Sequence, residues 1–139
     1  MSRRRKARET ALQTLYASEV SGKAWEEALV DMLGRRKPSE EAEEYARRIV
    51  RHVSESKDEL DKMIIESLEN WRFDRVSIID RMILRIALAE LIHCQEVPVN
   101  VIINEAIEIA HKFSSSKAGK FVNGILDKLA REVREDGGS

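Results

Sequence analysis

Five basic side chains crowd the first eight residues of the chain, with no acidic residue among them: Arg3, Arg4, Arg5, Lys6 and Arg8. Guanidinium and ammonium groups form charge-assisted hydrogen bonds with phosphates and displace condensed counterions from nucleic acids. The whole chain has a formal net charge of -1, and without these five bases 19 bases remain against 25 acids. We therefore expect an anionic ligand such as RNA at one end of the molecule, although a solvated basic tail would have the same composition.

The helical wheel separates the last of these bases from the others. Residues 3–6 point in nearly all directions, so we expect the first turn to extend past the core and to surround a strand. Arg8 is in line with Leu12 and Leu15. Packing of its aliphatic stem over the core is therefore as good an interpretation as a phosphate contact.

A second basic stripe accompanies an aromatic residue near the C-terminus. It consists of Lys117, Lys120, Phe121, Gly124 and Lys128, beside an apolar face of Val122, Ile125, Leu126 and Leu129. A ring flanked by lysines suits a single-stranded base, which stacks on the ring while ammonium groups hold its phosphates. The spacing is equally compatible with Phe121 in the core. For the RNA interpretation, the opening turn and the Phe121 edge must lie together, so that one strand touches both.

Two Glu-x-x-His motifs, Glu90–His93 and Glu108–His111, have the spacing found in di-iron helix bundles. Glu90 lies in the inward arc of its helix, whereas Glu108 lies opposite the centre of its apolar face, so the two carboxylates cannot converge on one metal. We interpret Glu90 as a buried, hydrogen-bonded carboxylate. The chain offers no nucleophile paired with a base and no glycine-rich phosphate loop, so we expect neither an enzyme nor a bound metal or cofactor.

Apolar residues recur at helical spacing along the 139-residue chain, which predicts an all-α fold of about seven helices in one compact domain, 1–139. We expect two half-bundles, about 1–70 and 74–135, with a link at Trp71–Asp74 and a frayed tail at 136–139. The expected helices run from a Ser2 cap to Ser21, ended by Gly22; Ala24–Leu33, ended by Gly34; a long helix from the Ser39 cap to Leu68, bent near Ser54–Ser56; Ile78–Cys94, apolar all round and so central; Val99–Phe113; and Lys117 to about Glu135, capped by Ser114–Ser116.

The composition also bears on the compartment. Cys94 is the single cysteine, so no intramolecular disulfide can form. No apolar run reaches the ~18 residues of a membrane span, and the basic N-terminus is not followed by the apolar segment of a signal peptide. We expect a cytoplasmic protein with no membrane partner.

Several longer motifs occur together in the order typical of one family. The segments Arg4–Glu9, Ala11–Gln13 and Leu15–Tyr16 resemble the opening of the NusB family of bacterial antitermination factors. The second half is more similar still, at Leu84–Leu88, Val97–Pro98, Ile103–Glu108 and Lys120–Lys128. The resemblance covers nearly the whole chain, and Ala24–Trp71 matches only in pattern.

The resemblance implies an all-helical fold of two halves that binds the boxA element of RNA together with NusE, a small-subunit ribosomal protein, in the transcription elongation complex. By position, the RNA-facing residues are Arg4, Arg5, Lys6, Arg8, Gln13, Lys120 and Phe121, and the NusE-facing residues are Tyr16, Asp74 and Asp80. Lys117 stands where relatives often carry an acid, and we expect it to strengthen RNA binding and to loosen its selectivity.

Two other functions remain open on the sequence. The chain could be a protein-interaction scaffold whose basic arm is incidental, or an accessory module of an rRNA methyltransferase. The sequence also leaves open whether the free protein is a monomer or a homodimer.

Overall fold

The structure is a computed structural model that describes residues 3–69 and 72–134. The expected Ser2 cap, the Arg3 side chain, Trp71 and the tail 136–139 lie outside the described part. The described residues form seven α-helices and one 3-10 helix: α1 (Arg3–Ser21), α2 (Trp25–Arg36), α3 (Glu40–Glu55), α4 (Lys57–Ser67), η1 (Phe73–Arg75), α5 (Ile78–His93), α6 (Val99–Phe113) and α7 (Ala118–Val133). The predicted all-α class is confirmed.

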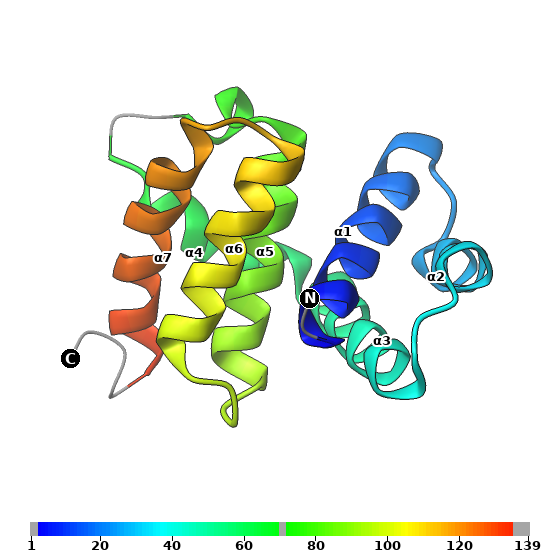
Figure 1. Ribbon diagram of the computed structural model, residues 1–139. Helices are drawn as coiled ribbons and strands as arrows, with labels where there is room; N and C mark the ends of the chain where they lie inside the picture. The colour runs from blue at the N-terminus through cyan, green and yellow to red at the C-terminus, as the bar shows by residue number, and fades with distance from the viewer. Residues whose placement is uncertain (1–2, 70–71, 135–139) are drawn as a thin grey trace.

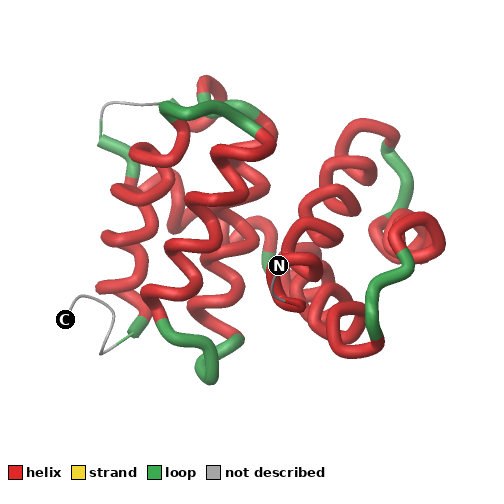
Figure 2. The backbone as a smooth tube through the Cα atoms, viewed as in Figure 1, coloured by secondary structure: helices red, strands yellow, loops and turns green. Residues whose placement is uncertain are grey.

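The helices form two groups that lie side by side (Figure 1). One group contains α1, α2 and α3, and the other contains α4, α5, α6 and α7, with loops confined to the ends of the helices (Figure 2). Helix α4 packs on α5 and α7. The chain therefore passes from one half to the other at Ser56, before the Trp71–Asp74 link at which the sequence places this change.

Helix α5 forms the centre of the molecule, as its all-round apolar character predicts. Every residue from Met82 to Leu91 is buried, and the helix contacts α1, α3, α4, α6 and α7. Ten consecutive buried residues require neighbours on all sides of a helix, because each turn presents side chains in every direction.

Local signals place most helix ends correctly. Gly22 has a φ of 77° and follows the last residue of α1, a left-handed conformation that glycine adopts without steric cost. The Ser39 hydroxyl accepts a hydrogen bond from the Ala42 N–H at 3.2 Å. In the triple serine, Ser115 Oγ accepts one from the Ala118 N–H at the start of α7.

Two expected boundaries are wrong. Gly34 does not end α2, which continues to Arg36; Lys37 takes the left-handed conformation with a φ of 46°, and its N–H donates to the Leu33 carbonyl. The long helix expected over 39–68 is two helices, because at Ser56 the backbone leaves helical geometry, with φ -116° and ψ 19°. This break lets α4 turn onto α5 and α7. No described helix is long and apolar enough to cross a membrane.

Candidate nucleic-acid interface

The opening turn of α1 is held against the bundle. Arg5 Nε donates to Glu105 Oε1 of α6 at 2.9 Å, and a second guanidinium nitrogen donates to Glu105 Oε2. The Arg4 guanidinium lies 5.2 Å from the centre of the Tyr45 ring. From Arg4 onward the turn therefore does not extend past the core as expected, and its exposed cations are Arg4 and Lys6.

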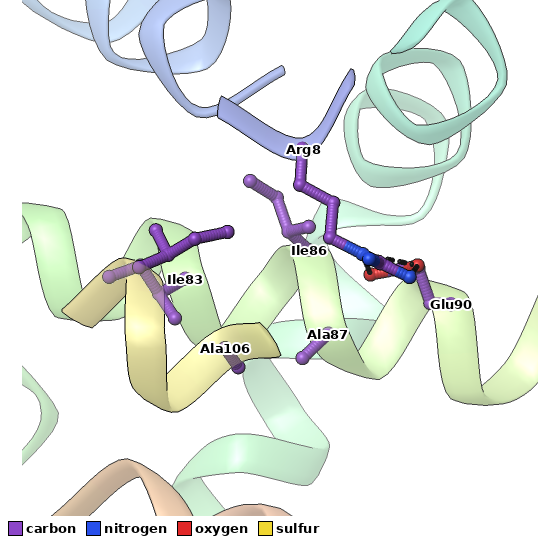
Figure 3. A pocket seen from close by; sticks show the side chains of 7 residues that line it. Arg8, Ile83, Ile86, Ala87, Glu90 and Ala106 are labelled. Carbon is purple, nitrogen blue, oxygen red and sulfur yellow. Dashed lines mark hydrogen bonds and ion pairs between the residues drawn. The ribbon is translucent and has the colours of Figure 1, made fainter. Parts of the chain in front are cut away.

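Arg8 is fully buried and binds a carboxylate of the central helix. Only 2% of its surface is exposed, and its Nε donates to both oxygens of Glu90 at 2.9 Å (Figure 3). Tyr45 donates its hydroxyl hydrogen to Glu90 Oε1 at 2.6 Å. A ligand cannot reach Arg8 in this conformation. Of the two interpretations of Arg8, packing in the core therefore fits its position, and the expected contact with RNA does not.

The electrostatics of this cluster agree with a structural role. Burial lowers the pKa of Arg8, but hydrogen bonding to Glu90 and the Glu90 charge more than compensate, so the pKa of Arg8 is raised. Burial, followed by the charge of Glu90, strongly raises the pKa of the Tyr45 hydroxyl. Arg8 therefore stays charged and Tyr45 stays protonated, which is the state that the hydrogen bonds require.

The predicted positions of the two glutamates in the Glu-x-x-His motifs, one inward and one outward, are confirmed. Glu90 is buried and hydrogen-bonded to Arg8 and Tyr45, whereas Glu108 is exposed. The His93 ring stacks on His52 of α3 at 4.0 Å between ring centroids. Within residues 3–69 and 72–134, no three or more side chains of His, Cys, Asp or Glu are grouped to hold a metal ion.

Gln13 belongs to a second polar cluster, which joins three helices. Its Oε1 accepts a hydrogen bond from Arg36 at the end of α2, at 2.8 Å. The neighbouring Glu9 is buried and accepts from Lys112 of α6 at 3.1 Å and from Arg36 at 3.4 Å. Sequence reasoning missed Arg36 and Lys112, because only tertiary packing brings the ends of α2 and α6 beside α1.

The start of α7 presents the second basic stripe. Lys117 and Lys120 are exposed, Val122 is buried, and Phe121 is half-buried against the core. Both interpretations of the Phe121 spacing, a core residue and a ring open to a ligand, are therefore partly right, because one part of the ring packs in the core and the other part faces out. Farther along the stripe, Lys128 binds the Ser67 carbonyl and the Glu69 carboxylate.

The opening turn and the Phe121 edge do not lie on neighbouring helices. In Figure 1, α5 and α6 both lie between α1 and α7; α6 packs on α7, and Glu105 and Lys112 of α6 bind residues of α1. A strand that touches both basic groups must therefore span the distance between α1 and α7.

The three residues expected to face a protein partner lie on different elements. Tyr16 is 40% exposed on α1, and Asp74 in η1 is exposed and paired with Arg72 at 2.9 Å. Asp80 lies in the first turn of α5 and lines a pocket of about 330 Å³ together with Arg75, Lys117 and Phe121. The structure thus brings Asp80 next to Phe121, which the resemblance assigns to RNA, and next to Lys117, at which the chain departs from its relatives.

Comparisons with known proteins give a consistent result. The pattern of the NusB family matches residues 5–131. The chain is 41% identical over 133 residues to transcription antitermination protein NusB of Bacillus subtilis, covering 96% of this chain and 98% of that protein. It is 37% identical over 144 residues to the protein of the same name from Symbiobacterium thermophilum, covering 98% of this chain and 94% of that protein.

Solved structures agree with these sequence matches. T. maritima NusB superposes with a TM-score of 0.89 at 36% identity, covering 96% of this chain and 95% of that one. A chain from the crystal structure of the antitermination factors NusB and NusE in complex with dsRNA gives a TM-score of 0.86 at 28% identity, covering 95% of this chain and 98% of that one.

Proposed function

This chain belongs to the NusB family of transcription antitermination proteins, and we propose that it binds boxA-type single-stranded RNA together with the ribosomal protein NusE. The family is not a family of enzymes. The observation that carries the proposal is the likeness to a NusB chain whose structure was solved with NusE and dsRNA. We place this activity in the bacterial cytoplasm, within the transcription elongation complex.

The RNA surface that we propose comprises exposed cations and one aromatic ring. Arg4 and Lys6 on α1, and Lys117 and Lys120 at the start of α7, are exposed and available to phosphates. The half-buried Phe121 offers a partly exposed ring on which an unstacked base can lie. Single-stranded RNA suits this ring better than a duplex, because bases within a duplex have no free face.

Three RNA-facing candidates take a supporting role in this proposal. Arg5 is bound to Glu105, Gln13 is bound to Arg36, and Arg8 is bound to Glu90. Their bonds fix α1 against α6, α2 and α5, and so hold the exposed cations in place. For the protein partner, we propose the side of the molecule that carries Tyr16, Asp74 and the start of α5.

A salt titration tests the RNA surface. With four phosphate contacts, from Arg4, Lys6, Lys117 and Lys120, log affinity should fall against log salt with a slope of about -2.8, from ~0.7 per contact on single strands. The measurement is fluorescence anisotropy with a boxA-like RNA, its scrambled version and a duplex, each with and without NusE. Lys120→Gln should make the slope shallower by about 0.7.

Two further variants sharpen this titration. Arg131→Gln is the matched control, because Arg131 is an exposed cation of the same helix, near its other end, and pairs with Asp127; it should leave the slope unchanged. Lys117→Asp should weaken binding to all three RNAs and widen the preference for boxA. A flat salt response would contradict the RNA proposal, and binding of NusE alone would favour an interaction scaffold.

A further inference from the structure

The end of α6 contacts both helices that carry the proposed RNA-binding cations. Lys112 Nζ donates to Glu9 Oε2 of α1 at 3.1 Å. The preceding residue, His111, packs on the first turn of α7, where a methyl group at Gly119 would collide with its ring. A short loop then joins this end of α6 to the start of α7 (Figure 1). His111 and Lys112 are both exposed, so they occupy the surface between α1 and the start of α7.

Two cations from different helices bind one buried carboxylate at this place. The Glu9 side chain is 2% exposed, and its Oε1 accepts from Lys112 Nζ at 3.2 Å and from Arg36 of α2 at 3.4 Å. Because both nitrogens lie within 3.4 Å of the same oxygen, the two cationic heads are close together. One carboxylate balances one of the two cations, so the group keeps one positive charge.

Both cations keep hydrogen-bond donors for an anionic ligand. An ammonium group has three N–H donors and a guanidinium group has five, more than the bonds to Glu9 and Gln13 use. The Lys112 side chain is 52% exposed and that of Arg36 is 19% exposed, so a ligand can reach both. Glu9 and Gln13 fix the two heads before a ligand arrives, which lowers the entropy cost of binding.

The charge and the position of this pair favour a phosphate of the RNA backbone. Guanidinium and ammonium groups form strong hydrogen bonds with anionic oxygens, and one phosphate presents oxygens to both heads. The exposed cations Lys6 on α1 and Lys120 on α7 lie on either side of the end of α6. A row of cations across three helices matches a chain with a negative charge at every unit, which is the backbone of RNA. A single carboxylate of a protein partner would match the charge of the pair without this continuity.

We propose that Arg36 and Lys112 together bind one backbone phosphate, at the point where the RNA strand passes over the end of α6 from α1 to α7. Glu9 is a positioning residue, which holds the two heads without touching the RNA. This inference rests on the proposed RNA binding and adds the path of the strand to it. One more phosphate contact changes the expected salt slope from about -2.8 to about -3.5. Since phosphate contacts carry no sequence information, the site should serve boxA-like and scrambled RNA equally.

Uncharged linkages in the RNA locate this phosphate. In a boxA-like oligonucleotide, the phosphates are replaced one at a time by methylphosphonates, and binding is measured by fluorescence anisotropy. Each replacement of a phosphate that contacts the protein should weaken binding to the wild type. Arg36→Gln/Lys112→Gln should abolish the loss at one position. That position should lie between the positions whose loss is abolished by Lys6→Gln and by Lys120→Gln.

The salt slope shows whether the two cations share one phosphate. Arg36→Gln/Lys112→Gln should make the slope shallower by about 0.7, whereas contacts with two separate phosphates would give about 1.4. Lys112→Gln alone leaves Glu9 paired with Arg36 and should reduce the loss at the same linkage, and Lys112→Arg, which keeps the charge, should preserve it. Circular dichroism checks that each variant is folded.

The matched control is Arg47→Gln/Lys57→Gln. It removes an arginine and a lysine that are likewise exposed and paired with glutamates, on α3 and at the start of α4. This double variant should keep both the wild-type slope and the wild-type pattern of linkages.

The outcomes separate this inference from the proposed function. A slope change near zero or near 1.4 overturns the shared phosphate. If the linkage that responds to Arg36→Gln/Lys112→Gln lies outside the interval set by Lys6 and Lys120, or if none responds, the strand path is overturned. The same holds if this variant impairs only NusE binding. If the wild type binds no RNA, the proposed function fails, and this inference fails with it.

Discussion

At the scale of single residues, the basic N-terminus divides into two classes with different roles. Arg4 and Lys6 are exposed, whereas Arg8 is buried against Glu90, with Tyr45 donating to the same carboxylate. A buried ion pair is costly to desolvate and becomes tolerable only when its hydrogen bonds are satisfied. The Arg8–Glu90 pair therefore fixes the position of α1 on α5 without itself contacting a ligand.

Removing one member of this pair should be strongly destabilising. Glu90→Gln leaves the Arg8 guanidinium buried without its counter-charge, and we expect a loss of about 3–5 kcal/mol in the free energy of unfolding, measured by urea denaturation. Glu108→Gln changes an exposed glutamate and should stay within about 0.5 kcal/mol of wild type. The double variant Arg8→Met/Glu90→Met should recover stability relative to Glu90→Gln. A small effect of Glu90→Gln would contradict the buried-pair interpretation.

At the scale of elements, the helices are joined by polar contacts as well as by apolar faces. The His52 ring of α3 stacks on the His93 ring of α5 at 4.0 Å between centroids, with the planes only 2° apart. Beside them, Arg48 of α3 donates to the His93 carbonyl at 2.7 Å. The contact between α3 and α5 joins the two halves, and it is built on two histidine side chains.

This contact should make stability depend on pH. Burial, then the charges of His93, Arg51 and Arg48, lower the pKa of His52 below its ordinary value near 6.5, against a raising effect of Glu55. As the pH falls below that value, His52 binds a proton more readily in the unfolded chain than in the folded chain, so the free energy of unfolding decreases. Urea denaturation between pH 8 and 5 should show a smaller decrease for His52→Gln than for wild type. Parallel curves would refute the assignment to His52.

At the scale of the whole molecule, α1 ties the two halves into one unit. It packs on α2 and α3 of its own half and on α5 of the other. Its ion pairs also cross between the halves, among them Arg8 with Glu90, Arg5 with Glu105 and Glu9 with Lys112. Since the RNA surface that we propose draws cations from both halves, this connection fixes the spacing between them.

We therefore expect the two halves to unfold together. Loss of far-ultraviolet circular dichroism and reaction of the Cys94 thiol should show the same midpoint on heating, because Cys94 is only 1% exposed and reacts only when its surroundings open. Burial raises the pKa of this thiol, which further slows its reaction in the folded state. Thiol reaction at a clearly lower temperature than loss of helix would indicate that the second half opens independently.

The sequence by itself determined the features that depend on neighbouring residues. Helical periodicity is a short-range pattern, and it predicts an all-α chain with a central helix at Ile78–Cys94. Capping at Ser39 and the left-handed turn at Gly22 likewise act within a few residues. The ordered family motifs identify the family for the same reason, because they can be recognised one segment at a time.

Only the tertiary structure decided which charged residues remain available to a ligand. Arg8 and Glu90 are 82 positions apart. No local pattern predicts that α1 will pack on α5 with these two side chains facing each other. The same holds for Asp80 and Phe121, which meet in one pocket because α5 and α7 pack together. Burial and ion pairing depend on which helices become neighbours, and that is a property of the assembled core.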